Sequence, residues 1–320
     1  MFDPSSPEEA YKMIGEAFEY SEKYNTPVLF RPTTRVCHAY ASIDNCDSPS
    51  PKKYEGFVKD SKKWVIFPRL SFANHIMIEK RNVEIGKDFS TYSANKAEGV
   101  NSEKAVVTSG ISYAYTKECL KDYPDVKLIK IATAYPFPED FVLSSLEGAK
   151  EVLCIEELSP FIEEQILKLA GKHGLQLKVS GKLDGKVQAG GENSTDKIAA
   201  ILGEFLGKDF TAEGYDLSDA PALPVRPPVL CAGCPHRASF YAVKQAMKGR
   251  KAYFCGDIGC YTLGNAMPLD MVDTCLCMGA GITMAQGFNH TDSDGVCFGF
   301  VGDSTFFASG ITGVVNAVHN

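Results

Sequence analysis

A short acidic turn near residue 300 has the residue types that hold a phosphate and a cation. The apolar run Val296–Val301 is typical of a strand, and Gly302, Asp303 and Ser304 follow it. Apolar residues then recur every three or four positions, which predicts a helix with Ser304 as its N-cap. A carboxylate at the end of a strand, beside the start of a helix, suits a divalent cation bridged to a phosphate. The same pattern also occurs in ordinary strand–turn–helix connections, where the aspartate only caps the helix.

Two further turns in the last third of the chain combine cysteine with glycine. Cys231 and Cys234 form a Cys-x-x-Cys pair at the start of a predicted helix, a setting that suits redox chemistry or metal ligation. Cys260 ends the glycine-rich turn 256–260. Because these three cysteines flank turns instead of filling apolar faces, we interpret them as candidate ligands. Four other cysteines are interpreted as small core hydrophobes, a common role of the residue: Cys255, Cys275, Cys277 and Cys297.

Composition and charge describe an ordinary globular protein of the cytoplasm. The 320 residues suffice for two domains, and 44% are hydrophobic and 23% charged. The net charge of -7 argues against a nucleic-acid surface. No apolar run approaches the roughly 18–20 residues of a membrane span, and no signal peptide is recognisable. Without an export signal, the eleven cysteines are better interpreted as thiols or ligands than as disulfides.

The order of predicted elements indicates an α/β protein with two domains. Residues 1–45 hold the amphipathic helix Pro7–Tyr24 and a short strand, too little to bury a core, so we expect the tail of an incomplete domain. Residues 46–95 read as a linker with one strand near Trp64 to Phe67 and a helix after it. Strands alternate with helices in 96–219, which predicts a parallel sheet with helices on both faces. A proline-rich stretch then separates a second α/β domain, which begins at residue 220.

Two turns at the predicted edge of the first sheet also carry polar residues. Ser109 and Gly110 could hold a ligand, because sites in such folds lie at the carboxyl ends of strands. Without a Gly-x-Gly-x-x-Gly fingerprint, a tight connection is the simpler interpretation. Glu156 and Glu157 follow the third predicted strand and are interpreted as a solvated edge or a domain contact.

Several motifs, in this order, resemble the signatures of the 2-oxoacid:ferredoxin oxidoreductases, and in particular the alpha subunits of their indolepyruvate branch. The resemblance covers nearly the whole chain, and spaced motifs in the right order are far more specific than any one of them. The motifs are Arg31-Pro-Thr-Thr-Arg35, Ser109-Gly-Ile-Ser-Tyr113, Cys231-Ala-Gly-Cys-Pro-His-Arg237, Gly256-Asp-Ile-Gly-Cys-Tyr261, Cys277-Met-Gly-Ala-Gly281 and Gly302-Asp-Ser-Thr-Phe-Phe307.

The resemblance implies a domain plan and an internal fragment. Residues 1–45 would be the tail of a domain that binds the pyrimidine of thiamine diphosphate, and 46–95 a linker. Residues 96–219 would be a transketolase C-terminal-like α/β domain. Residues 220–320 would be the N-terminal part of the diphosphate-binding domain, which would continue beyond this chain. A ferredoxin-like domain with two clusters would also lie outside it, so the fragment alone is expected to be inactive.

The resemblance also implies a reaction and its partners. An aryl pyruvate such as indolepyruvate would be oxidatively decarboxylated to an acyl-CoA, with thiamine diphosphate as the electron sink and coenzyme A as co-substrate. Iron–sulfur clusters, mostly on absent segments, would pass the electrons to ferredoxin, and a beta subunit would complete the enzyme. Two alternatives stay open: a pyruvate or 2-oxoglutarate enzyme of the same family, and a zinc-binding α/β module without thiamine chemistry.

Site residues follow from the same resemblance. Asp303 would ligate Mg²⁺, and Ser304 and Thr305 would hold the diphosphate. His236 would reach the substrate or the diphosphate, or else cap its helix. Cys231, Cys234 and Cys260 match positions that hold a [4Fe–4S] cluster in related enzymes, although such a cluster takes four thiolates. The remaining cofactor-lining residues would be Gly256, Asp257, Gly259, Cys260, Met278, Gly279, Gly281 and Gly302.

Overall fold

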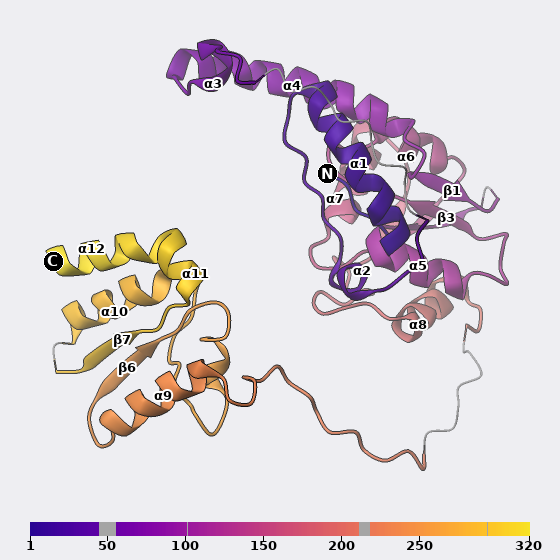
Figure 1. Ribbon diagram of the computed structural model, residues 1–320. Coiled ribbons are helices and arrows are strands. Elements are labelled where there is room, and N and C mark those ends of the chain that lie inside the picture. Colours follow the sequence, from indigo (N-terminus) through magenta and orange to yellow (C-terminus); the bar gives the residue numbers. More distant parts are fainter. Residues whose placement is uncertain (45–55, 101, 211–217, 293) are drawn as a thin grey trace. The chain divides into compact units, whose positions relative to one another are not determined.

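The computed structural model describes residues 1–44, 56–100, 102–210, 218–292 and 294–320. The chain forms two compact units, Met1–Tyr215 and Asp216–Asn320, here named the N-terminal unit and the C-terminal unit (Figure 1). Each unit contains a sheet covered by helices, so the predicted α/β class is confirmed. None of the described helices combines the length and the apolar character that a membrane crossing requires.

The N-terminal unit is built on a five-stranded sheet in the order β1-β3-β2-β4-β5. Only the edge pair of β1 with β3 is antiparallel, and the other pairs are parallel. A parallel sheet is buried on both faces, which explains why its central strands are almost continuously apolar. The strands are β1 (Lys96–Glu98), β2 (Lys104–Thr108), β3 (Lys127–Lys130), β4 (Glu151–Ile155) and β5 (Lys178–Ser180).

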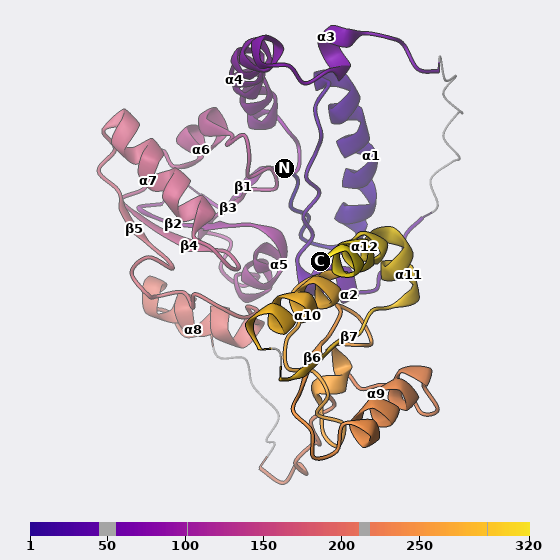
Figure 2. The same cartoon turned by 90° about the vertical axis from the view of Figure 1, so that its left-hand side faces the viewer.

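Helices cover both faces of this sheet, as predicted, and Figure 2 shows the three layers. Two of them, α6 (Glu139–Ser145) and α7 (Phe161–His173), pack on the face that carries Val107 and Ile129. Figure 2 places α5 (Gly110–Cys119) and α8 (Thr195–Leu206) on the opposite side. Alternate residues of β2, β3 and β4 therefore contribute to two separate cores, which fixes the register of these strands.

The first helices of the chain pack on this unit and share one aromatic core with it. Phe2 and residues of α1 (Pro7–Tyr24) contact Phe89 of α4 (Pro68–Ser90), and Ala132 joins them from the end of β3. Phe2 and Phe89 meet edge to face with their ring centroids 5.5 Å apart. The assignment of residues 1–45 to a pyrimidine-binding domain stays a prediction.

The strand predicted near Trp64 to Phe67 is wrong. The short helix α3 (Ser61–Trp64) lies there instead, and the Asp60 carboxylate accepts the N–H of Lys62 at 2.9 Å. Phe67 is the N-cap of α4, and Pro68 takes the first helical position, where proline is favoured. The capping residue Asp60 and the proline Pro68 therefore decide the local structure, and the apolar run 64–67 forms no strand. Its side chains are exposed, and no strand in the described part of the chain lies beside it to pair with. Residues 46–55 of the predicted linker lie outside the described residues.

The C-terminal unit has a parallel pair of strands, β6 (Ala252–Cys255) and β7 (Val296–Gly299). Helix α9 (Pro235–Ala246) sends Phe240 into a small core with Phe300, and α10 (Ala280–Thr291) packs on both strands. The one-turn η1 (Leu263–Asn265) lies between the two strands in the sequence. After β7, a continuous helical segment follows, made of α11 (Asp303–Thr305), η2 (Phe306–Gly310) and α12 (Ile311–His319).

Three local predictions are corrected by the structure. The helical segment starts at Asp303, and its N-cap is Gly302, not Ser304, because Gly302 takes the extended cap conformation. Cys277 is exposed and fills no core, since its turn lies at the surface, whereas Cys255 is buried as predicted. Glu156 is only 4% exposed, so it does not form a solvated edge. Its carboxylate accepts two backbone N–H groups at the start of α7, at 2.9 and 3.0 Å, because the N-cap Pro160 has no side-chain acceptor.

Removal of the Glu156 carboxylate should therefore destabilise the N-terminal unit. We expect Glu156→Ala to lower the free energy of unfolding by about 1–3 kcal/mol, because two buried N–H groups lose their acceptor. The exposed Glu164, in the first turn of the same helix, is the matched control, and Glu164→Ala should change stability much less. Urea denaturation measures both, and equal losses would contradict the capping role.

Candidate functional site

Three turns meet at one edge of the C-terminal unit. Because β6 and β7 run parallel, the residues that follow each strand emerge at the same edge of the sheet. The N–H of Phe300 donates to the carbonyl of Cys255 at 2.8 Å, which extends the pairing to these turns. Gly256 follows β6, Gly302 follows β7, and the left-handed Gly279, with φ +88°, precedes α10.

A buried carboxylate joins two of these turns. Asp257 is 2% exposed. Its Oδ1 accepts the N–H of Gly279 at 2.7 Å, and its Oδ2 accepts the N–H of Gly302 at 3.1 Å. We call this arrangement the aspartate bridge. The sequence marked Asp257 as a residue that lines a ligand but gave no sign of this bridging role, since the three residues are far apart in the chain.

Glycine is required where α10 meets the strands. A Cβ on Gly281 would lie 2.8 to 3.0 Å from three backbone carbonyl oxygens, those of Cys255, Gly256 and Phe300. A Cβ on Gly279 would lie 2.7 Å from the hydroxyl of Ser309. The first turn of α10 therefore rests directly on the strand ends. Around Gly302, by contrast, a Cβ would lie 3.8 Å from its nearest neighbour, Oδ2 of Asp257, which is an ordinary van der Waals distance, so this turn is less tightly packed.

Asp303 lies at this edge of the sheet and is exposed, as is Ser304. Thr305 is 3% exposed and faces the interior. The first intrahelical hydrogen bond of the segment runs from the N–H of Phe306 to the carbonyl of Gly302 at 2.8 Å. The N–H groups of Asp303, Ser304 and Thr305 precede that bond, so a carboxylate and a helix start lie together at the surface.

The predicted cysteine ligands are not gathered into one group. Among the residues that the structure describes, no three His, Cys, Asp or Glu side chains lie close enough to hold a metal ion. Cys231 and Cys260 are exposed, while the Cys234 sulfur lies 3.1 Å from Nδ1 of His236. The His236 ring meets the Tyr261 ring edge to face, with their centroids 4.6 Å apart. Gly259 and Met278 are exposed on the same turns as Asp257 and Gly279.

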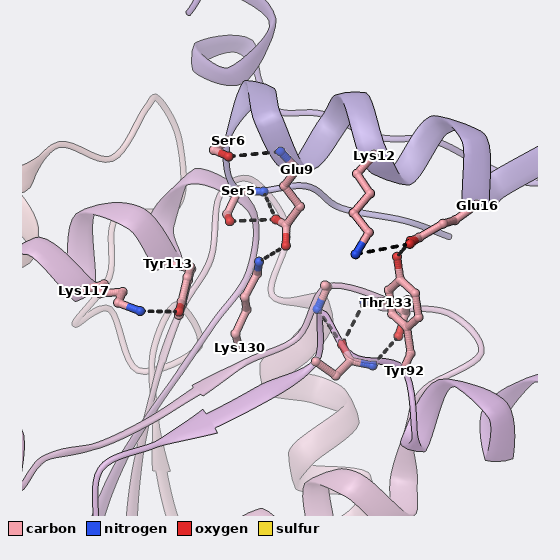
Figure 3. Close-up of polar contacts among 12 residues, drawn as sticks. Ser5, Ser6, Glu9, Lys12, Glu16, Tyr92, Tyr113, Lys117, Lys130 and Thr133 are labelled. Carbon is pink, nitrogen blue, oxygen red and sulfur yellow. Dashed lines mark hydrogen bonds and ion pairs between the residues drawn. The ribbon is translucent and has the colours of Figure 1, made fainter. Parts of the chain in front are cut away.

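A second polar cluster lies in the N-terminal unit, between α1 and the end of β3 (Figure 3). Lys130 is 2% exposed and pairs with Glu9, whose carboxylate also accepts the N–H and hydroxyl of Ser5, both at 2.7 Å. Burial lowers the pKa of Lys130. The Lys130 ammonium lies 4.7 Å from the ring centre of Tyr113. The Tyr113 hydroxyl oxygen accepts a hydrogen bond from the Lys117 ammonium at 3.2 Å. These contacts fasten α1 to the sheet.

Two of the sequence motifs meet in the same unit. A Cβ on Gly110 would lie 3.0 Å from both Asp3 and Thr33, so the Ser109 turn packs against the segment that contains Arg31. The Arg31 guanidinium donates to Asp3 at 3.1 Å. Burial nevertheless raises the pKa of Asp3 to about 6, against the opposing effect of Arg31. The folded chain therefore binds a proton here more tightly than the unfolded chain does.

This pKa predicts a pH-dependent difference between the wild type and Asp3→Asn. The folded state holds the proton between about pH 4 and pH 6, so the contribution of Asp3 to stability falls as pH rises through that window. We expect the variant to gain stability relative to the wild type at pH 7 compared with pH 4. Urea denaturation at both pH values measures this, with the exposed Asp122→Asn as control. A variant–wild-type difference that is the same at both pH values would contradict the prediction.

The chain is similar to curated proteins named indolepyruvate oxidoreductase subunit IorA. The protein from Methanothermobacter thermautotrophicus is 36% identical over 329 residues, which cover 100% of this chain and 52% of that protein. For Thermococcus kodakarensis the identity is 33%, with 100% and 53% covered. For Archaeoglobus fulgidus it is 32%, with 99% and 51% covered. The chain thus spans about half the length of these relatives.

Other comparisons add little. No protein-family model matches the chain. A solved structure titled "Split gene transketolase, inactive beta4 tetramer" covers 36% of this chain and 42% of its own, with 12% identity and a TM-score of 0.28, which is too low to bear on the fold. The likeness of residues 96–219 to a transketolase C-terminal domain stays a prediction. The resemblance expected from the motifs is confirmed: along its whole length, this chain is a relative of the indolepyruvate oxidoreductase IorA subunits.

Proposed function

We propose that the C-terminal unit binds the diphosphate of thiamine diphosphate, with its Mg²⁺, in the alpha subunit of an indolepyruvate ferredoxin oxidoreductase. The observation that carries the proposal is the meeting of three glycine turns at one sheet edge beside the exposed carboxylate of Asp303. The names of the relatives support the choice of enzyme.

The residues present suit this cofactor. Mg²⁺ prefers oxygen ligands and usually takes one or two carboxylates together with substrate phosphates. Asp303 offers such a carboxylate, which is exposed beside the less tightly packed Gly302 turn. The N–H groups of Ser304 and Thr305 at the helix start favour a negative charge. Asp303 would therefore hold the metal, and the helix start would hold the diphosphate.

The remaining parts of the reaction belong to the same proposal. When bound, thiamine diphosphate supplies the electron sink for decarboxylation of an aryl 2-oxoacid. Coenzyme A would accept the acyl group, and iron–sulfur clusters would carry the electrons to ferredoxin. A beta subunit would complete the assembly. Cys231, Cys234 and Cys260 stay a hypothesis as cluster ligands, because three thiolates are one short of the four that a [4Fe–4S] cluster takes.

The role of Asp303 predicts a loss of metal-dependent binding. In the enzyme assembled from the full-length alpha subunit and its partner, Asp303→Asn should weaken Mg²⁺-dependent thiamine diphosphate binding by at least roughly tenfold, because a neutral amide is a poorer ligand for a hard cation. Isothermal titration calorimetry measures the affinity. Asp294→Asn, an exposed change before the start of β7, is the control and should bind normally. An unchanged affinity for Asp303→Asn would remove this residue from the site.

The 320-residue chain alone should not oxidise indolepyruvate. Its relatives are about twice as long, and the proposed cofactor site needs a pyrimidine-binding domain that we expect in the other half. A viologen-reduction assay with indolepyruvate, coenzyme A, thiamine diphosphate and Mg²⁺ tests this. Turnover above the level of a preparation of Asp303→Asn would contradict the division of the site.

A further inference from the structure

The aspartate bridge joins three parts of the chain through one side chain. Asp257 follows β6, Gly279 is the N-cap of α10, and Gly302 is the N-cap of the helical segment after β7. Each carboxylate oxygen takes one N–H. A carboxylate is rigid and planar, so the distance between its two oxygens sets the distance between the two turns.

Asp257 is itself held firmly by its surroundings. Its carbonyl accepts the hydroxyl of Thr262 at 2.7 Å, and the N–H of the preceding Gly256 donates to the carbonyl of Thr274, also at 2.7 Å. Asp257 is buried, and both oxygens already have donors. The residue is therefore badly placed to ligate a metal ion and well placed to fix the backbone around it.

The bridge leaves the phosphate-binding N–H groups free for another partner. It uses the N–H groups of the two N-cap residues, whereas a phosphate at a helix start is bound by the N–H groups that come after the cap. Charged acceptors make the stronger hydrogen bonds, particularly away from water. A buried carboxylate can thus hold both turns open before any ligand arrives, so that binding does not have to order them.

We propose that Asp257 is a positioning residue that holds the Gly279 and Gly302 turns at the spacing required by both phosphates of one thiamine diphosphate. The inference rests on the proposed function and assigns Asp257 a task different from that of Asp303. Asp257 acts through the two glycine turns and does not touch the cofactor.

The test compares two cofactors in the assembled enzyme with full-length subunits. Thiamine monophosphate and thiamine diphosphate are titrated with Mg²⁺ by calorimetry, and the ratio of their dissociation constants measures what the second phosphate contributes. In Asp257→Asn, one oxygen becomes an NH₂ group that cannot accept an N–H. We expect the ratio to fall roughly tenfold or more, because the turns no longer hold both phosphates. A merely structural defect would weaken both cofactors alike and leave the ratio unchanged.

Two further variants make the outcome decisive. Asp273→Asn is the matched control, since the Asp273 carboxylate also accepts a backbone N–H, that of Phe254 at 2.7 Å, but bridges no glycine turns. Its ratio should equal that of the wild type. Asp257→Glu keeps both oxygens and shifts them by one methylene, so it also should lower the ratio, and it decides the matter if Asp257→Asn does not fold.

The two proposals fail in different ways. A wild-type ratio in both Asp257 variants, with thiamine diphosphate still bound by the wild type, would overturn the positioning role and leave the proposed function standing. Absence of thiamine diphosphate binding by the wild-type enzyme would overturn the proposed function, and the positioning role with it.

Discussion

The parallel pairing of β6 with β7 is the constraint on which the candidate site depends. It brings the ends of two strands, 45 residues apart at Asp257 and Gly302, to one edge of a sheet. Two strands offer little area for fixing the loops that follow them. Close packing of Gly281 on three carbonyl groups and the buried carboxylate of Asp257 supply the order that a wider sheet would give.

The N-terminal unit is held together mainly by apolar packing on both faces of its sheet. Its five strands bury two apolar cores, and the buried Asn95 amide oxygen accepts the N–H groups of Ala132 and Thr133 just after β3. Other polar groups lie where helices are attached: Glu156 caps α7, and Lys130 with Glu9 fastens α1. Each of these charged groups already has a partner inside the protein, so these contacts give no sign of a ligand.

Much of the fold could be predicted from the sequence, because local patterns carry it. Helix Pro7–Tyr24 has the expected bounds, since proline lies at its start and apolar residues follow the helical period. The strand expected near Trp64 to Phe67 was wrong, since only tertiary context shows that no sheet lies beside this run. The turns could be located as well, but the bridge between them could not. A hydrogen bond from Asp257 to Gly302 depends on strand pairing, which leaves no periodic trace in the chain.

The pair Asp257 and Asp303 shows how one sequence pattern acquires two roles. Each aspartate follows a glycine in the turn after a parallel strand, so the local sequence pattern does not distinguish them. Burial does. Asp257 turns inward and satisfies two backbone donors, whereas Asp303 begins a helix at the surface and keeps its carboxylate accessible to solvent. A carboxylate that is buried and already accepts two backbone N–H groups is a poorer candidate for a metal ligand than one that is exposed to solvent. In this site Asp257 therefore fixes the backbone, and Asp303 is the carboxylate that is available to a cation.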